Sequence, residues 1–227
     1  MTEHSRAHDA ADSSNDEVVF DAAFWNDRYA SAPQIWSGNP NPQLVVETTD
    51  LTPTTALDIG SGEGADAVWL ARRGWQVTAV DISQVALDRA AAHARSAGDD
   101  VADRISWVQA DLTADPAPDL GMSFGLVSSQ FMHLAAPQRD TLFRRLAAAV
   151  GPGGTLLVVG HDLSDLHTAP QMRPHHPELM FTVDEIVALL DPAGWTIVAA
   201  ESRPRSVIDP DGQPAHVADA VVVARRR

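Results

Sequence analysis

From residue 55 onward, short apolar runs of strand length alternate with longer segments whose apolar residues recur at helical spacing. This alternation is typical of βαβ units, in which helices connect parallel strands. A turn-rich segment at 209–212 separates the last two strands and favours an antiparallel final pair. The strands are expected at 56–59, 76–80, 105–109, 124–128, 154–160, 196–201 and 218–224, and the main helices at 65–73, 84–96, 137–150 and 183–190.

The part of the chain before this alternation has a different character. Apart from Met1, residues 1–17 contain no large apolar side chain, so burial cannot offset the entropy of ordering them, and we expect a disordered tail. Helices are expected at 20–30, where aromatic residues recur four positions apart, and at 43–48. The pattern therefore predicts a single domain over 18–227, with residues 18–53 as a helical cover.

The charge of the chain excludes several classes of partner. Its 227 residues include 16 Lys and Arg against 31 Asp and Glu, a formal net charge of −15. A field of this sign repels phosphate backbones and anionic lipids, so we expect neither nucleic acid nor a membrane as a partner. All the basic residues are arginines, which excludes a Walker-type phosphate lysine and a Schiff-base lysine.

The absence of cysteine bears on the compartment and on the chemistry. Without cysteine the chain has neither disulfides nor a thiolate nucleophile. The polar, acidic N-terminal segment is unlike a signal peptide, and no apolar run approaches the roughly 18 residues of a membrane helix. These features together predict a cytoplasmic protein.

The most informative segment lies between the first strand and its helix and reads Asp58-Ile59-Gly60-Ser61-Gly62-Glu63-Gly64. Glycines at such a position let the backbone turn sharply and approach a ligand closely. Gly60, Gly62 and Ala65 also satisfy the glycine pattern of dinucleotide-binding proteins. The loop alone therefore leaves open which nucleotide-like cofactor it binds.

Three carboxylates narrow that choice. Asp58 lies two residues before the first glycine, where it would repel a pyrophosphate but could meet a cationic amino group. Asp81 follows the second strand, where a carboxylate can accept hydrogen bonds from both hydroxyls of a ribose. Asp111, after the third strand, is placed to accept a hydrogen bond from an adenine amino group. Together they favour a cationic nucleoside, and an NAD-dependent oxidoreductase is the alternative.

These segments resemble the class I S-adenosylmethionine-dependent methyltransferases in their order and spacing. The resemblance rests on residues 57–64, 80–83, 111–112 and 151–154. It implies an α/β fold, namely a Rossmann-like, doubly wound, mostly parallel seven-stranded sheet with an antiparallel last strand. It also implies S-adenosyl-L-methionine as the cofactor, with the methionine part on the glycine loop, the ribose on Asp81 and the adenine between Ile82 and Asp111. The predicted cofactor-binding residues are Asp58, Gly60, Ser61, Gly62, Gly64, Asp81, Ile82, Asp111, Leu112 and Gln130.

The aromatic N-terminal segments 24–29 and 36–38 resemble the cover of small-molecule methyltransferases of the thiopurine and tellurite-resistance type. In such enzymes an N-terminal helix folds over the cofactor and lines the acceptor pocket. The resemblance therefore implies that Trp25, Tyr29 and Trp36 bind the substrate. The alternative is that these aromatic residues only pack on the sheet.

The fourth-strand region departs from the pattern of these families. Phe124-Gly125-Leu126-Val127 stands where an acidic residue commonly follows the phenylalanine. The strand also lacks the Asn/Asp-Pro-Pro-Tyr motif of enzymes that methylate nucleobases, because Ser128-Ser129-Gln130-Phe131 stands there instead. The first departure leaves open a non-catalytic module that only binds S-adenosylmethionine, and the second agrees with the exclusion of nucleic acid.

Two histidines are candidates for catalysis. Methyl transfer from a sulfonium is an in-line displacement, so alignment supplies much of the rate, and a hydroxyl or protonated amine also needs a base. His133 and His161 follow the fourth and fifth strands, and open α/β sheets bind ligands beyond such strand ends. The alternative is that His133 caps a turn and His161 satisfies loop carbonyls.

The segment 161–180 is rich in histidine and apolar residues. His167, His175 and Glu178 suggest a metal site, but their spacing is neither helical nor that of a hairpin, so no metal is expected. The segment is instead a candidate lid over the acceptor. The sequence as a whole predicts methyl transfer to the sulfur, nitrogen or oxygen of a thiol-like or heteroaromatic small molecule, in detoxification or natural-product tailoring.

Overall fold

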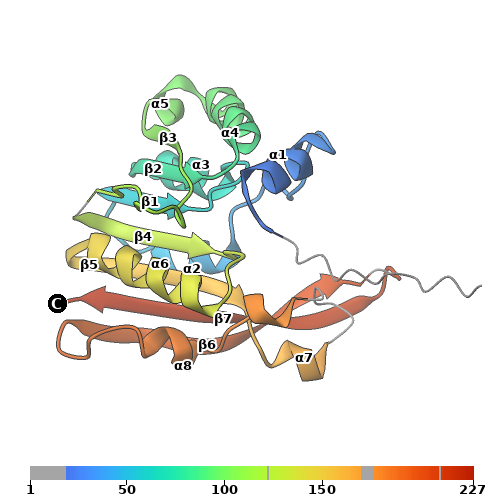
Figure 1. The fold of residues 1–227 in the computed structure, drawn as a ribbon. Helices are drawn as coiled ribbons and strands as arrows, with labels where there is room; N and C mark the ends of the chain where they lie inside the picture. The colour runs from blue at the N-terminus through green and yellow to red at the C-terminus, as the bar shows by residue number, and fades with distance from the viewer. Residues whose placement is uncertain (1–18, 122, 170–175, 210) are drawn as a thin grey trace, which may run out of the picture.

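A computed structural model of the chain describes residues 19–121, 123–169, 176–209 and 211–227. The described residues form one seven-stranded sheet in the order β3-β2-β1-β4-β5-β7-β6 (Figure 1). Strands β1 to β5 pair in parallel, and β7 lies antiparallel between β5 and β6, which confirms the predicted fold class. The strands are β1 (Thr55–Ile59), β2 (Gln76–Asp81), β3 (Ile105–Gln109), β4 (Phe124–Gln130), β5 (Val150–His161), β6 (Trp195–Ile208) and β7 (Pro214–Arg226).

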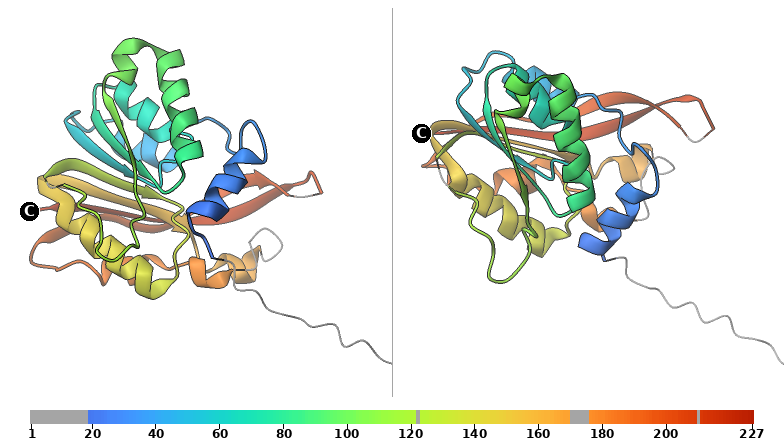
Figure 2. Two further views of the ribbon diagram at one scale, coloured as in Figure 1. Left: turned by 45° about the horizontal axis from the view of Figure 1, so that its top comes forward. Right: turned by 90° about the horizontal axis from the view of Figure 1, so that it is seen from above.

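The helices lie on both faces of the sheet (Figures 1 and 2). The predicted helices are present with ends shifted by one to three residues, whereas the short α5 and α7 were not predicted. Local capping explains several starts: the Ser83 hydroxyl accepts from the Ala86 amide ahead of α4, and Thr182 and Glu185 form a capping box at α8. The helices are α1 (Ala22–Ala30), α2 (Pro42–Thr48), α3 (Ala65–Arg72), α4 (Gln84–Ala97), α5 (Asp99–Ala102), α6 (Ala136–Ala149), α7 (Asp165–Thr168), α8 (Val183–Val187) and the 3₁₀ turn η2 (Pro177–Leu179).

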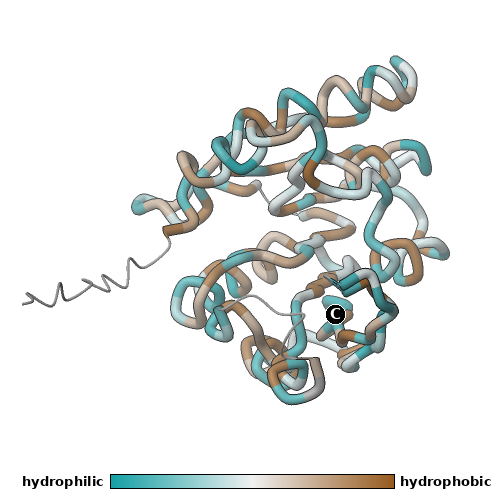
Figure 3. Tube along the Cα trace, turned by 90° about the vertical axis from the view of Figure 1, so that its right-hand side faces the viewer, coloured by the Kyte–Doolittle hydropathy of each residue, from teal (hydrophilic) through white to brown (hydrophobic). Residues whose placement is uncertain are grey.

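Alternating side chains of the central strands bury two apolar layers, one on each face of the sheet. Leu57 packs in the layer with α6 and α8, whereas its neighbour Ala56 packs in the layer with α2 and α3. Leu156 and Leu157 of β5 divide in the same way. Hydrophilic and hydrophobic residues mix along the outer helices, as one-sided burial requires (Figure 3). Both layers anchor the strands whose ends form the site described below.

The final hairpin is much longer than the sequence predicted. Strand β6 was expected at 196–201 but continues to Ile208, and its ladder with β7 extends to the pair Ile208–Pro214. The sequence did not predict this extension because it contains polar residues and two prolines, Pro204 and Pro214. Its β6 strand is only partly buried, with half-buried and exposed residues alternating. The far end of the hairpin projects past the sheet on the same side of the molecule as α1 (Figures 1 and 2). Residues of β6 and β7 thereby reach the edge where β1 and β4 end.

The N-terminal cover is fixed to the rest of the domain by polar contacts. The Asp21 carboxylate accepts from the Phe24 amide at the start of α1, and the Ser83 hydroxyl donates to the Asn26 side chain at 2.8 Å. Helix α1 therefore lies against the start of α4. The predicted tail, residues 1–17, falls outside the described residues.

Candidate active site

The loop between β1 and α3 has the backbone conformation that its glycines predict. Gly60, Gly62 and Gly64 have φ angles of 69°, 51° and 82°, in the left-handed region that disfavours side chains. At Gly64 an added Cβ would lie 2.7 Å from both the Ala90 Cβ and the Trp107 ring. Gly64 also provides no capping side chain to α3, so the first amides of that helix remain available to a ligand.

A cavity of about 720 Å³ opens at this loop and along the carboxyl ends of the parallel strands. Its size suits a small-molecule ligand. Asp58 does not line it. The other predicted residues do line it, from the cofactor set Gly60, Ser61, Gly62, Gly64, Asp81, Ile82, Asp111, Leu112 and Gln130, from the substrate set Trp25, Tyr29 and Trp36, and from the candidate bases His133 and His161.

We divide this cavity into two parts. The glycine-loop half comprises residues 60–66, 80–82 and 110–113, which follow β1, β2 and β3. The aromatic half comprises residues that follow β4 and β5, a pair from the β6–β7 hairpin and the aromatic face of the N-terminal cover. Its members are Phe20, Trp25, Phe131, His133, His161, Arg205 and Asp219.

Asp81 is held at the glycine-loop half by two backbone amides. One oxygen accepts from the Gly62 amide and the other from the Ser83 amide, both at 2.8 Å. Burial raises the pKa of Asp81, and these two hydrogen bonds oppose the shift. Asp81 thus ties the glycine loop to the end of β2 and holds its carboxylate at the cavity wall.

Asp58 and Asp66 form a buried acidic pair around the start of α3. Asp58 lies behind the loop, and one of its oxygens is buried without a hydrogen-bond partner among the described residues. Burial, with the charges of Asp66 and Asp81 added, raises its pKa well above the usual value. Asp66 lines the cavity itself and accepts from the Asn41 amide at 2.6 Å, and burial raises its pKa to about 6. The position expected for Asp58 at the cavity wall is therefore taken by Asp66.

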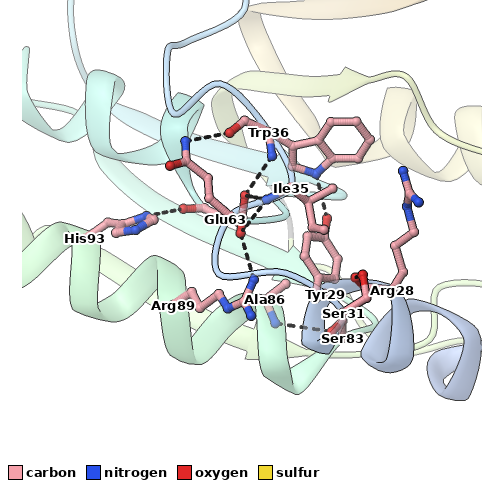
Figure 4. Close-up of polar contacts among 11 residues, drawn as sticks. Arg28, Tyr29, Ser31, Ile35, Trp36, Glu63, Ser83, Ala86, Arg89 and His93 are labelled. Carbon is pink, nitrogen blue, oxygen red and sulfur yellow. Dashed lines mark hydrogen bonds and ion pairs between the residues drawn. The ribbon is translucent and has the colours of Figure 1, made fainter.

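Glu63 joins the glycine loop to the N-terminal cover. Its carboxylate accepts from the amides of Ile35 and Trp36, at 3.1 and 3.0 Å, and pairs with Arg89 of α4 at 3.0 Å (Figure 4). The Trp36 indole in turn donates to the Tyr29 hydroxyl at 3.0 Å. We call Glu63 and these contacts the cover latch. It places two aromatic side chains of the cover over the loop.

Asp66 and Glu63 were not predicted as site residues. Both are acidic residues in or directly after the glycine loop, and this position was the available signal in the sequence. Their backbone partners lie 25 to 28 positions earlier in the chain. Those contacts depend on the path of the cover, which no local pattern describes.

Two polar atoms at the cavity wall lack partners among the described residues. The Ser61 hydroxyl and the Gln130 side-chain oxygen are both buried without a hydrogen bond, although the Gln130 amide nitrogen donates to the Ser128 hydroxyl at 2.8 Å. Buried polar atoms normally find a partner, so these two are places for ligand hydrogen bonds. Asp111, by contrast, is exposed and already accepts from the amide and hydroxyl of Thr113.

The aromatic half brings together rings from distant parts of the chain. The His133 ring lies 5.2 Å from the Trp25 ring and 6.5 Å from the His161 ring, between centroids. The Phe131 ring lies 4.7 Å from that of His161, and the Phe20 ring 5.9 Å from that of His133. Burial lowers the pKa of His133, so this imidazole is neutral at neutral pH.

Three aromatic residues of the N-terminal cover lie at the cavity wall. Trp25, Tyr29 and Trp36 all line the cavity, and Trp36 keeps 47% of its surface exposed. Tyr29 is buried, which raises its pKa to about 12, and it stands over Gly62, where a Cβ would come within 2.8 Å of the Tyr29 hydroxyl. The three side chains therefore lie at the cavity wall, and their role in binding a substrate stays a prediction.

Gly125 lies outside the cavity, at the start of β4. A Cβ at this position would collide with the Thr54 side chain, so a larger residue does not fit. The position without the expected carboxylate therefore lies at the opposite end of the strand from the cavity, where Thr54 leaves no room for a side chain. It gives no support to loss of catalysis.

The candidate lid at 161–180 includes residues 170–175, which lie outside the described residues. His175 of the metal hypothesis lies in the same range. Among the residues that are described, no group of three or more His, Asp or Glu side chains could hold a metal ion. Within the same part of the chain, no helix is both long and apolar enough to cross a bilayer.

The fold and part of the sequence are similar to those of known methyltransferases. A β3-β2-β1-β4-β5-β7-β6 sheet with antiparallel β7 carries a glycine loop after β1 and a carboxylate after β2. This is the fold of the class I S-adenosylmethionine-dependent methyltransferases, and solved structures of such enzymes share it with this chain. Residues 56–154 match the family described as a methyltransferase domain.

Two curated relatives resemble part of the chain. An uncharacterized methyltransferase of Mycobacterium tuberculosis strain H37Rv is 35% identical over 127 residues, which are 56% of this chain and 60% of the relative. Methyltransferase GfsG of Streptomyces halstedii is 31% identical over 152 residues, which are 64% of this chain and 53% of that protein. The chain thus spans little more than half the length of these relatives.

Solved structures share the fold. TehB from Haemophilus influenzae has a TM-score of 0.67 at 17% identity, covering 89% of this chain and 67% of its own. A chain from a study of thioacetal formation during echinomycin biosynthesis has a TM-score of 0.67 at 23% identity, covering 90% and 92%. The glycopeptide N-methyltransferase MtfA, solved with S-adenosylmethionine, has a TM-score of 0.58 at 18% identity, covering 80% and 90%.

Proposed function

We propose that the protein transfers the methyl group of S-adenosylmethionine to a small-molecule acceptor. The observation that carries this proposal is one continuous cavity with two chemically different halves. The glycine-loop half offers amides and carboxylates to a cationic nucleoside, and the aromatic half offers rings and neutral imidazole to an acceptor. Met132, between Phe131 and His133 of the aromatic half, lies next to Gly60 of the glycine-loop half, so a bound donor and acceptor would meet there.

The residues of the glycine-loop half fit the donor. Ser61 and Gln130 present buried polar atoms that still lack a partner among the described residues, and Asp81 presents a fixed carboxylate for the ribose. Asp66, whose pKa of about 6 leaves it mainly ionised above neutral pH, supplies negative charge near the start of α3, where the amino group of the donor is to be held. When bound, S-adenosylmethionine supplies an electrophilic methyl group on a sulfonium.

In the aromatic half we assign His133 as the general base for a hydroxyl or ammonium acceptor. Its lowered pKa keeps the imidazole free to accept a proton at neutral pH. His161, 6.5 Å away between ring centroids, stays a second candidate, while Trp25, Tyr29 and Trp36 orient the acceptor and exclude water. A thiol or an aromatic nitrogen would need only this orientation.

The biological setting we propose is natural-product tailoring or detoxification. Solved structures with this fold include a chain studied in echinomycin biosynthesis and a glycopeptide N-methyltransferase. An acidic chain of net charge −15 disfavours a nucleic-acid acceptor, which agrees with a small molecule.

Calorimetric titration of the purified protein with S-adenosylmethionine, S-adenosylhomocysteine and NAD tests the donor assignment first. We expect micromolar binding of the first two and none of NAD. A screen of thiols, phenols and heteroaromatic amines, read by mass spectrometry as a gain of one methyl group, then tests transfer. NAD binding would replace the proposal with an oxidoreductase, and donor binding without any methylated product would favour a binding module.

A further inference from the structure

We propose that the acceptor carries a carboxylate on an aromatic ring and that Arg205 recognises this carboxylate. The inference rests on the proposed function, because it concerns the acceptor of the same reaction. Arg205 lies in the extension of β6 that the sequence did not predict, and it lines the aromatic half of the cavity.

The register of the hairpin explains how Arg205 reaches the cavity. His161 of β5 pairs with Asp219 of β7, and Asp219 pairs with Arg203 of β6. Arg205 lies two residues beyond Arg203, so its side chain is on the same face of the sheet as those of Asp219 and His161. The hairpin extension therefore carries a cation to a candidate base.

Asp219 fixes the guanidinium group of Arg205. The Arg205 Nε donates to one carboxylate oxygen at 2.9 Å, and Nη2 donates to the other at 3.2 Å. Asp219 is only 1% exposed, and such two-point pairing holds the guanidinium in one orientation. A purely structural ion pair would have the same geometry. Whether Arg205 also binds a ligand depends on the N–H donors that Asp219 does not use.

Arg205 retains donors that the described residues do not use. A guanidinium has five N–H groups, of which Asp219 takes two, and the remaining three have no partner within the described ranges. The Arg205 side chain keeps 32% of its surface exposed and lies at the cavity wall. The free donors suit a planar oxyanion that binds at two points.

The surroundings favour a singly charged aromatic acid. Arg205 is the one basic residue other than histidine among the described residues of the cavity wall, whose carboxylates otherwise cluster in the glycine-loop half. Because Asp219 already offsets part of its charge, a monoanion fits better than a dianion. The guanidinium also lies 5.8 Å from the Phe131 ring, which continues the aromatic wall beside His161.

Phe131, which lies next to Arg205, has a strained backbone conformation. Its φ angle is 51°, in the left-handed region that a bulky aromatic residue rarely occupies. Such strain persists only where the surroundings fix the residue, and it gathers at functional sites. Here the strained residue places its ring close to both Arg205 and His161, where β4 ends at the cavity.

The test compares benzoate with benzamide, which have nearly the same shape but differ in charge. Calorimetry on protein saturated with S-adenosylhomocysteine is expected to give benzoate about tenfold or more tighter binding than benzamide. Arg205→Gln should remove this preference. Arg203→Gln is the matched control, because Arg203 lies on the same strand and face but outside the cavity wall, and it should retain the preference.

Arg205→Gln leaves Asp219 buried without its cation, so its fold requires a separate check. The double variant Arg205→Gln/Asp219→Asn removes both charges, and its melting temperature and S-adenosylhomocysteine affinity report whether the fold is intact. Equal binding of benzoate and benzamide, or a preference that survives in a folded Arg205 variant, would overturn the inference. Failure of S-adenosylhomocysteine to bind the unmodified protein would instead overturn the proposed function.

Discussion

The two halves of the cavity draw their residues from the chain in different ways. The glycine-loop half takes its wall from 60–66, 80–82 and 110–113, each directly after a strand. The aromatic half assembles Phe20, His161 and Arg205, which are far apart in the sequence. Its wall is therefore sensitive to substitutions and insertions in several separate segments, whereas the glycine-loop half depends on one continuous supersecondary unit. This division suits a domain that keeps one donor while its acceptor site varies.

The largest expected effect is on kcat and comes from the aromatic half of the cavity, through His133. His133→Gln should lower kcat for a hydroxyl or ammonium acceptor by about a hundredfold or more, while S-adenosylmethionine affinity stays unchanged. In the unmodified protein kcat should rise with pH and reach half of its maximum below pH 6.5, because burial holds the pKa of His133 below its ordinary value of 6.5. Steady-state kinetics over pH 5 to 8 measures both. If the fall in kcat at low pH were the same in His133→Gln, the general base would be another residue.

The second largest expected effect is on the affinity for S-adenosylmethionine and comes from Asp81 of the glycine-loop half. Asp81→Ala removes the carboxylate bound by the Gly62 and Ser83 amides and predicted to bind the ribose. A net loss of about 2.7 kcal/mol, within the range for a hydrogen bond to a charged group, predicts S-adenosylmethionine binding weaker by roughly a hundredfold. Calorimetry measures this change, and Asp88→Ala, an exposed carboxylate on α4, is the control. Equal affinities of the two variants would remove Asp81 from the donor site.

The same comparison explains what the sequence could predict. Strands β1, β2 and β3 follow from local periodicity and were predicted to within one residue, whereas β5 begins four residues earlier than expected and β4 ends two residues later. The glycine loop and Asp81 follow from spacing along one βαβ unit. The extension of β6 was missed because its residues are polar and only half-buried, and its pairing depends on β7. Arg205 and Asp219 were missed with it, since neither lies in a motif and their meeting requires the hairpin register.

A pH effect on donor binding, smaller than the preceding two, tests the acidic pair of the glycine-loop half. Burial raises the pKa of Asp66 to about 6, so this carboxyl is largely protonated at pH 5 and ionised at pH 7.5. A cationic donor favours the ionised form, so its affinity should rise with pH through 6, by up to about tenfold. Calorimetry in two buffers of different ionisation enthalpy should detect proton release near pH 6 and little at pH 8. In Asp66→Asn the affinity should depend less on pH, and equal affinity at pH 5 and 7.5 in the unmodified protein would contradict the assignment.

The smallest effect concerns the cover latch, which belongs to neither half alone. Glu63→Gln removes the negative charge that holds the Ile35 and Trp36 amides and pairs with Arg89. A loss of about 1 kcal/mol corresponds to roughly fivefold weaker binding. Because Trp36 and Tyr29 connect the latch to both ligands, we expect this loss for S-adenosylhomocysteine and for the acceptor alike. Arg89→Gln breaks only the ion pair and should have less effect. A loss restricted to one ligand would show that the cover serves one half of the cavity alone.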